Sequence, residues 1–142
     1  MFAKQLTVFI ENRTGRLSEV LTVLKSNNVN ILSLSLADTT EFGLLRLIVD
    51  QPALGKEKLT EKGFSSLISD VSIIKIAHQV GALQELLAVI DKSRVNIEYM
   101  YGLSIDADVA YVVLKASDSE ELDAILTRCG IETVTGERLL NS

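Results

Sequence analysis

Apolar residues near the start of the chain first alternate with other residues and then recur at helical spacing. Leu6, Val8 and Ile10 occupy every second position, which predicts a β-strand with one buried face. From residue 17 the apolar positions follow the spacing i, i+3, i+4, i+7, which places one apolar stripe along an α-helix. This stripe consists of Leu17, Val20, Leu21 and Leu24.

The same pattern returns 66 positions later. The alternating residues are then Ser72, Ile74 and Ile76, and the helical stripe is Leu83, Leu86, Leu87 and Ile90. Two short motifs return at the same distance: Gly15-x-Leu17 as Gly81-x-Leu83, and Val29-Asn30-Ile31 as Val95-Asn96-Ile97. Repetition at one fixed distance indicates a duplicated structural unit.

After this helix, each half predicts a second strand, at residues 31–36 and 97–103. A third strand, a second helix and a last strand follow. The β-rich runs are residues 44–50 and 109–115, and the last strands are expected at 64–69 and 131–134. In the second half, Ser117-x-x-Glu120 resembles a capping box and Gly130 a C-terminal stop. The helix between them carries the stripe Leu122, Ile125, Leu126 and Cys129.

The corresponding helix of the first half has clear ends but a weak apolar stripe. Pro52 suits a first turn, and Gly63 suits an end. Only Leu54 and Leu59 form the stripe, and Gly55 weakens the helix further.

Each half therefore has the order β-α-β-β-α-β, which is the split βαβ of the ferredoxin-like α+β class. We expect two such units, residues 1–69 and 70–142, each with an antiparallel four-stranded sheet and two helices on one face. No linker rich in Pro, Gly or Ser separates them near Asp70. The halves are accordingly expected to sit tightly against each other.

Apolar residues on the strands also predict self-association. Two helices cover only one face of such a sheet, yet apolar side chains fall on both faces of the strands. These include Leu32, Leu34 and Leu36 in the first half and Tyr99, Tyr101 and Leu103 in the second. We expect another copy of the chain to cover the open face, in a homodimer or a higher homo-oligomer.

The turns around Gly15 and Gly81 are candidates for anion binding. A helix that begins there presents unpaired backbone N–H groups with partial positive charge, and a glycine lets a ligand approach the main chain. Such an end accepts small anions, including carboxylates. Asn30 and Asn96, at the start of the following strand, carry amides that donate and accept hydrogen bonds. A structural interpretation is also open, because Asn and Gly are common in turns.

These residues and their order resemble those of tandem ACT domain proteins across about residues 3 to 140. The resemblance implies a non-catalytic module that senses a free amino acid, which binds at interfaces between ACT units. The glycine turn and the second-strand asparagine would grip the ligand. The family commonly has Pro before the glycine and an acidic or Asn residue earlier in the turn. The implied binding residues are Asn12, Arg13, Thr14, Gly15, Arg16, Leu17, Asn30 and Ile31, and in the second copy His78, Gln79, Val80, Gly81, Ala82, Leu83, Asn96 and Ile97.

Composition excludes several classes of protein. The net charge is −5 and no basic block occurs, which argues against binding to a nucleic acid. No apolar run approaches the roughly 18 residues of a membrane span, and we expect no secretion signal. One histidine, His78, and one cysteine, Cys129, form no metal site, and no cofactor is expected. A single cysteine fits a cytoplasmic location, and we expect Cys129 to be a buried apolar filler.

Three other functions remain open from the sequence. The chain could be a regulatory subunit that acts on a partner amino-acid biosynthetic enzyme by oligomerisation. The ferredoxin-like shape also occurs in acylphosphatase-type hydrolases, in which Arg13 and Asn30 could take the roles of the essential Arg and Asn. RNA-recognition modules share the strand order but require sheet aromatics and a basic surface, and aromatic residues make up only 5% of this chain.

Overall fold

The computed structural model describes residues 2–11, 14–38, 42–77, 79–105 and 109–135. The chain divides into two compact units. The N-terminal unit is Lys4–Ser69, and the C-terminal unit is Asp70–Ser142 together with Met1–Ala3.

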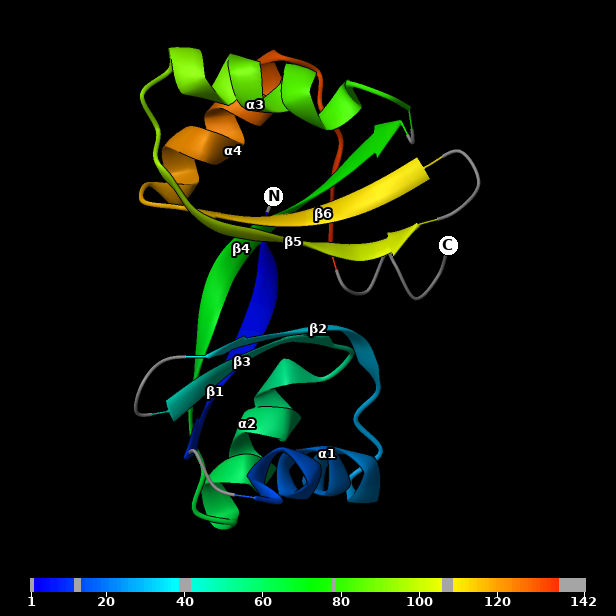
Figure 1. Cartoon of the computed structure of the whole chain (residues 1–142), viewed down its shortest axis with the longest axis vertical. Helices are drawn as coiled ribbons and strands as arrows, with labels where there is room; N and C mark the ends of the chain where they lie inside the picture. The colour runs from blue at the N-terminus through cyan, green and yellow to red at the C-terminus, as the bar shows by residue number, and fades with distance from the viewer. Residues whose placement is uncertain (1, 12–13, 39–41, 78, 106–108, 136–142) are drawn as a thin grey trace. The chain divides into compact units, whose positions relative to one another are not determined.

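The N-terminal unit has the predicted β-α-β-β-α-β order, and its strands are arranged as β2-β3-β1-β4. Its elements are β1 (Ala3–Glu11), α1 (Arg16–Ser26), β2 (Ile31–Asp38), β3 (Phe42–Val49), α2 (Pro52–Glu61) and the first part of β4 (Ser65–Ala77). Both β1 and β2 pair antiparallel with β3. Helices α1 and α2 lie on one face of these strands (Figure 1).

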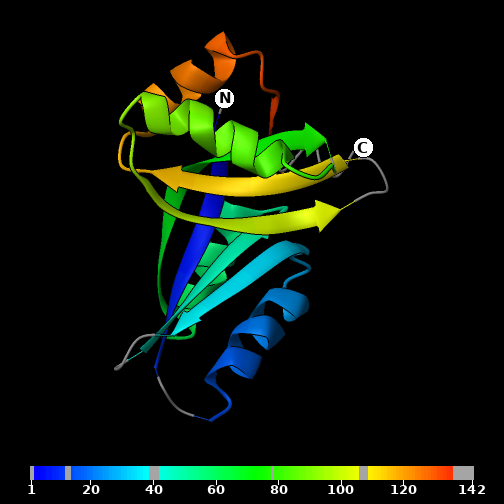
Figure 2. The ribbon, with the colours of Figure 1, turned by 45° about the horizontal axis from the view of Figure 1, so that its top comes forward.

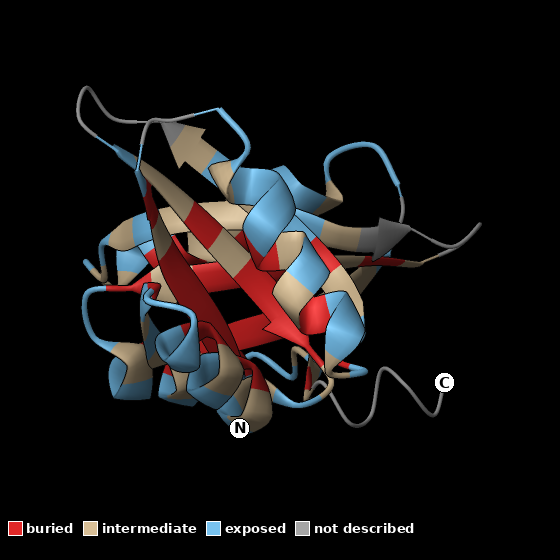
Figure 3. Cartoon of the chain, turned by 90° about the horizontal axis from the view of Figure 1, so that it is seen from below, coloured by how far each residue is buried: buried red, intermediate tan, exposed pale blue. Residues whose placement is uncertain are grey.

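The alternation at the start of the chain produces the core of this unit. Leu6 and Val8 are fully buried and lie opposite Leu47 and Leu45 of β3. On α1, Val20 and Leu24 are buried against the same cluster, whereas Leu17, at the start of the stripe, is 36% exposed. Buried positions therefore concentrate on the strands, and exposed positions on the outer sides of the helices (Figure 3).

The C-terminal unit repeats the arrangement, with β7 pairing β4 and the order continuing through β6 to β5. Its elements are the rest of β4, α3 (Ala82–Lys92), β5 (Ile97–Ile105), β6 (Val109–Ala116), α4 (Ser119–Arg128) and β7 (Thr133–Val134). Helices α3 and α4 cover one face, as Figure 2 shows for α3 over β6 and β5. The α+β, ferredoxin-like fold expected from the sequence is thus confirmed in both units.

Strand β4 runs without interruption from Ser65 to Ala77. The sequence predicts two separate strands here, the last of the first half and the first of the second. They form one strand because Ser65–Ala77 contains neither Pro nor Gly and its second part is rich in β-branched residues. Its early residues belong to the N-terminal unit and its later residues to the C-terminal unit.

The expected start of α4 was wrong by one residue. Asp118, not Ser117, is the N-cap, and its carboxylate accepts a hydrogen bond from the backbone N–H of Glu121 at 3.0 Å. Asp118-x-x-Glu121 fits the capping-box pattern as well as Ser117-x-x-Glu120 does. The sequence alone therefore does not say which of the two residues is the N-cap.

Cys129 was expected to be buried and is exposed. Helix α4 ends at Arg128, and Cys129 is the C-cap, so the helical stripe stops before it. The glycines that end the second helices were identified correctly: Gly63 has φ of +85° and Gly130 has φ of +71°.

Gly55 is buried in α2, where the sequence suggested only a weakness. A Cβ at this position would lie 3.2 Å from Leu6 Cδ2 and 3.3 Å from Leu24 Cδ2. Glycine therefore permits α2 to pack closely over β1 and α1.

The register of β2 differs from a simple alternation. A shift between Ile31 and Ser33 places Leu34 opposite Leu47 and Leu36 opposite Leu45. Directly opposite residues share a face, so these leucines lie on the face that carries the core. They nevertheless remain 49% and 51% exposed, because β2 is the edge strand of this unit.

Candidate functional site

The two glycine turns have the same backbone geometry. Gly15 is the N-cap of α1 with φ of 88° and ψ of −9°, and Gly81 is the N-cap of α3 with φ of 86° and ψ of −8°. This left-handed conformation explains why glycine is needed. Neither helix has a side chain that caps its N-terminus.

Open space surrounds both glycines. A Cβ built on Gly15 or Gly81 would have no neighbouring atom within 4 Å. The backbone N–H of Glu19 donates to the carbonyl of Gly15, and the N–H of Glu85 donates to the carbonyl of Gly81. The N–H groups that come before these two in each helix therefore have no acceptor within the helix. Both turns thus offer first-turn amides that an anion could approach.

The side chain of Arg16 is engaged within its own unit. Its guanidinium lies 2.7 Å from Glu19, 3.9 Å from Glu11 and 4.1 Å from the centroid of the Phe64 ring. The Arg16 side chain is only 13% exposed. At this position the backbone N–H, rather than the guanidinium, is available to a ligand, and Thr14 beside it is exposed.

The second turn presents mainly apolar side chains. Val80 is fully exposed, at 106%, and Leu83 is 36% exposed. The backbone N–H of Ala82 donates to the carbonyl of Gln79 at 3.2 Å. A hollow of about 590 Å³ adjoins the turn and is lined by Gln79, Gly81, Leu83, Gln84, Leu87, Ala88 and Asp91.

Backbone hydrogen bonds hold the two asparagines in equivalent places. The N–H of Asn30 donates to Asp50 Oδ1 at 2.8 Å, and its carbonyl accepts from the N–H of Asp50 at 3.1 Å. The carbonyl of Asn96 accepts from the N–H of Ser117 at 2.9 Å. Both asparagines are exposed, so their amides remain open to a ligand.

The isoleucines that follow these asparagines belong to the cores. Ile31 packs against the cluster of the N-terminal unit, and Ile97 packs against that of the C-terminal unit. The V-N-I motif therefore combines apolar anchors with one outward-facing amide.

Within one unit the glycine turn and the asparagine lie far apart. Gly15 precedes α1 and Asn30 follows it, and Gly81 and Asn96 are separated by α3 in the same way. A helix of 11 residues is about 16 Å long. A free amino acid is shorter than this, so one ligand cannot touch the glycine turn and the asparagine of the same unit.

Asn12, Arg13 and His78 lie outside the described residues. The hydrolase interpretation depends on Arg13 and therefore also falls outside the described part of the chain.

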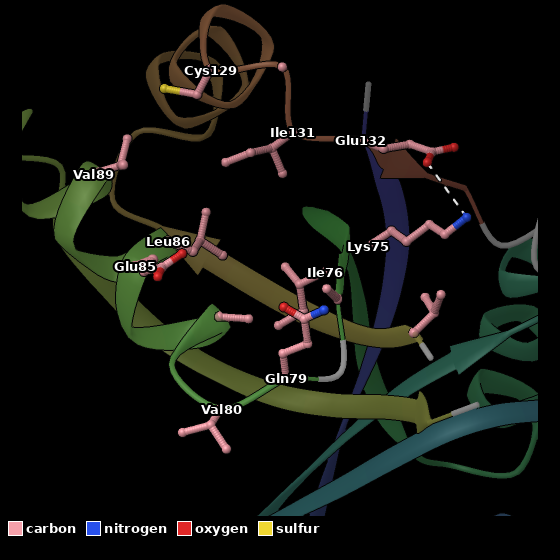
Figure 4. A pocket seen from close by; sticks show the side chains of 14 residues that line it. Lys75, Ile76, Gln79, Val80, Glu85, Leu86, Val89, Cys129, Ile131 and Glu132 are labelled. Atoms are coloured by element: carbon pink, nitrogen blue, oxygen red, sulfur yellow. Dashed lines mark ion pairs between the residues drawn. The ribbon is translucent and has the colours of Figure 1, made fainter. Parts of the chain in front are cut away.

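Sequence reasoning missed a cleft in the C-terminal unit. It has a volume of about 650 Å³ and is lined by Lys75, Ile76, Ala77, Gln79, Val80, Ala82, Glu85, Leu86, Val89, Val109, Cys129, Gly130, Ile131 and Glu132. Figure 4 shows α3 on one side of it and the Lys75–Glu132 ion pair, 3.8 Å apart, on the other. No periodic pattern marks the cleft, since its residues come from β4, α3 and β6, from the turn before α3 and from the segment between α4 and β7.

Among the described residues, no group of three or more His, Cys, Asp or Glu side chains could hold a metal ion. None of the helices in the described ranges has the length and apolar character needed to cross a bilayer.

A family model described as "ACT domain pair" matches residues 1–141. The acetolactate synthase isozyme 3 small subunit of Escherichia coli K12 is 29% identical over 133 residues, which cover 85% of this chain and 80% of that subunit. The crystal structure of protein BT0572 from Bacteroides thetaiotaomicron is 36% identical with a TM-score of 0.89, and the match covers 94% of this chain and 92% of BT0572. The regulatory subunit of aspartate kinase from Thermus thermophilus shares the fold at 15% identity and a TM-score of 0.61, over 88% of this chain and 91% of that subunit.

Proposed function

Because the chain belongs to the ACT domain pair family, we propose that it is a regulatory protein without catalytic activity that binds a free amino acid. The observation that carries this proposal is the pair of glycine turns with closely similar left-handed conformations, each with no side-chain cap on the following helix and with open space around the glycine.

The ligand's α-carboxylate binds the first-turn N–H groups after Gly15 or Gly81. Its α-ammonium is held by the amide oxygen of Asn30 or Asn96 from another ACT unit and by a backbone carbonyl. Charge-assisted hydrogen bonds contribute about 1.5–3 kcal/mol each. Three or four of them support micromolar affinity, about −8 kcal/mol, after the cost of association.

The bound amino acid changes how ACT units pack, and this change transmits the signal. The small subunit of an enzyme, acetolactate synthase isozyme 3, is among the relatives. We therefore propose that the chain acts in the cytoplasm on a partner enzyme of amino-acid biosynthesis.

The proposed assembly is a homodimer or a higher homo-oligomer. One feature supports it: Leu34 and Leu36 are about half exposed on the edge strand β2.

Calorimetric titration of the chain with each of the twenty amino acids tests the proposal. We expect one amino acid or a few related ones to bind with micromolar affinity. Asn30→Ala and Asn96→Ala should each weaken binding about ten- to a hundredfold where that copy is used, because one charge-assisted hydrogen bond is lost. Both asparagines are exposed, so the variants should remain folded.

Glu57→Gln, an exposed change on α2, is the control and should bind like the parent chain. If none of the twenty amino acids binds, the sensor function is wrong. If an amino acid binds to both asparagine variants as tightly as to the parent chain, the site is elsewhere.

A further inference from the structure

In the N-terminal unit, side chains fill most of the space that corresponds to the cleft of the C-terminal unit. Its volume is about 650 Å³, whereas the hollow at the corresponding place has about 310 Å³. The correspondence follows from the residues that line them. Glu85, Val89, Cys129 and Ile131 line the cleft, and Glu19, Val23, Lys62 and Phe64 take the equivalent positions in the smaller hollow.

Two side chains fill this place in the N-terminal unit. Arg16 stacks on Phe64, with 4.1 Å between its guanidinium carbon and the ring centroid, and pairs with Glu19 at 2.7 Å. The Arg16 side chain is 13% exposed and Phe64 is 4% exposed. A cation, an aromatic ring and a carboxylate therefore form one packed group.

The C-terminal unit has the same backbone without these two side chains. Ala82 is the first residue of α3, as Arg16 is of α1. Ile131 follows the glycine that ends α4, as Phe64 follows the glycine that ends α2. The N–H of Phe64 reaches the carbonyl of Leu59, and that of Ile131 reaches the carbonyl of Leu126, both at 2.9 Å.

The carboxylate, however, is retained. Glu85 corresponds to Glu19, and its side chain has no ion-pair partner among the residues that the structure describes. The other charged residues of the lining, Lys75 and Glu132, pair with each other. The lining thus has one net negative charge beside an apolar wall of Ile76, Leu86, Val89 and Ile131 (Figure 4).

We infer that this cleft binds a small organic cation that carries an apolar or aromatic group, and that Glu85 pairs with the cation. The cation takes the place that the Arg16 guanidinium has in the N-terminal unit, and the apolar group takes that of the Phe64 ring. The cleft shares Gln79, Val80 and Ala82 with the proposed amino-acid site, but its ligand belongs to a different class, because it needs no carboxylate.

Benzamidine joins a planar cation to an aromatic ring and tests this inference against benzamide, its neutral analogue of the same shape. Binding is followed by NMR titration of the full chain. We expect benzamidine to bind about two- to fivefold more tightly than benzamide, as a partly exposed ion pair allows. Neither probe has a carboxylate, so the outcome is independent of amino-acid binding.

Cys129 is the only cysteine of the chain and lines the cleft, so it reports on occupancy. Its alkylation by iodoacetamide should slow in the presence of benzamidine. An unchanged rate at a saturating concentration of benzamidine would place binding elsewhere and overturn the inference.

Two variants test separately the charge of the Glu85 carboxylate and the open volume of the cleft. Glu85→Gln should remove the preference for benzamidine over benzamide, and Ala82→Arg should abolish binding of both probes by refilling the cleft. Glu120→Gln, an exposed change in the first turn of α4, is the control and should keep the preference. Equal binding of the two probes to the parent chain, or a preference that survives Glu85→Gln, contradicts the inference.

The reverse experiment uses the N-terminal unit. Arg16→Ala combined with Phe64→Ile recreates the open arrangement beside Glu19, and the folded variant should bind a second benzamidine. If the folded variant binds only one benzamidine, the absence of these two side chains is not what makes the C-terminal cleft bind the probe.

Discussion

At the level of single residues, the four positive-φ glycines of the described chain follow the helix boundaries. Gly15 and Gly81 precede α1 and α3, and Gly63 and Gly130 follow α2 and α4. None of them has a neighbour within 4 Å of a built Cβ, so backbone conformation alone requires glycine there. Gly55 differs, because the packing of Leu6 and Leu24 requires it.

We predict that Gly81→Ala destabilises the chain by about 1–2 kcal/mol, since an L-residue with a Cβ is strained in the left-handed region. Gly81→Asn should lose less, because asparagine tolerates this conformation. Urea denaturation measures both. Gly102→Ala is the control, because Gly102 has an open Cβ position without a positive φ. An equal loss at positions 81 and 102 would contradict the conformational explanation.

At the level of elements, the start of α4 was ambiguous in the sequence because two capping patterns overlap there. Ser117-x-x-Glu120 and Asp118-x-x-Glu121 both fit a capping box, and the structure uses the second. The N–H of Ser117 instead bonds to the carbonyl of Asn96, which ties β6 to the start of β5. The choice depends on a strand that is distant in sequence.

We predict that Asp118→Ala lowers the free energy of unfolding by about 1 kcal/mol through loss of the N-cap. Ser117→Ala should change it by less than about 0.5 kcal/mol, as is usual for surface substitutions. Thermal or urea denaturation of the two variants distinguishes the caps. A larger loss for Ser117→Ala than for Asp118→Ala would reverse the assignment.

At the level of the whole molecule, duplication preserved the backbone while the side chains diverged. The glycine turns agree within a few degrees, yet Arg16 corresponds to Ala82 and Phe64 to Ile131. One unit is filled at this place, and the other has a cleft. The two copies thus have the same fold but different side chains and a different cavity volume at this place.

We predict that the chain sediments as a dimer or larger assembly at micromolar concentration. Leu34→Glu combined with Leu36→Glu should shift it toward the monomer, because charge would be buried if the β2 edge forms the contact. The control is Lys56→Glu, which makes the same change in net charge at an exposed position on α2, away from β2. Sedimentation velocity measures the outcome, and a monomeric parent chain would exclude self-association.

The sequence alone determined the order of elements, the duplication and the positions of the glycine turns. These features are local, because periodicity, helix signals and positive-φ glycines depend on residues within one or two turns of each other. The family resemblance rested on the same short motifs, and the match over residues 1–141 confirmed it.

The tertiary structure decided the features that depend on residues far apart in the chain. These are the continuous β4, the shifted register of β2, the exposed Cys129, the packing at Gly55 and the separation of Gly15 from Asn30 by the length of α1. The cleft beside Glu85 is another feature that only the tertiary structure decided. Packing depends on how side chains from distant parts of the chain fill the same space. The spacing of residues along one strand or helix therefore does not predict it.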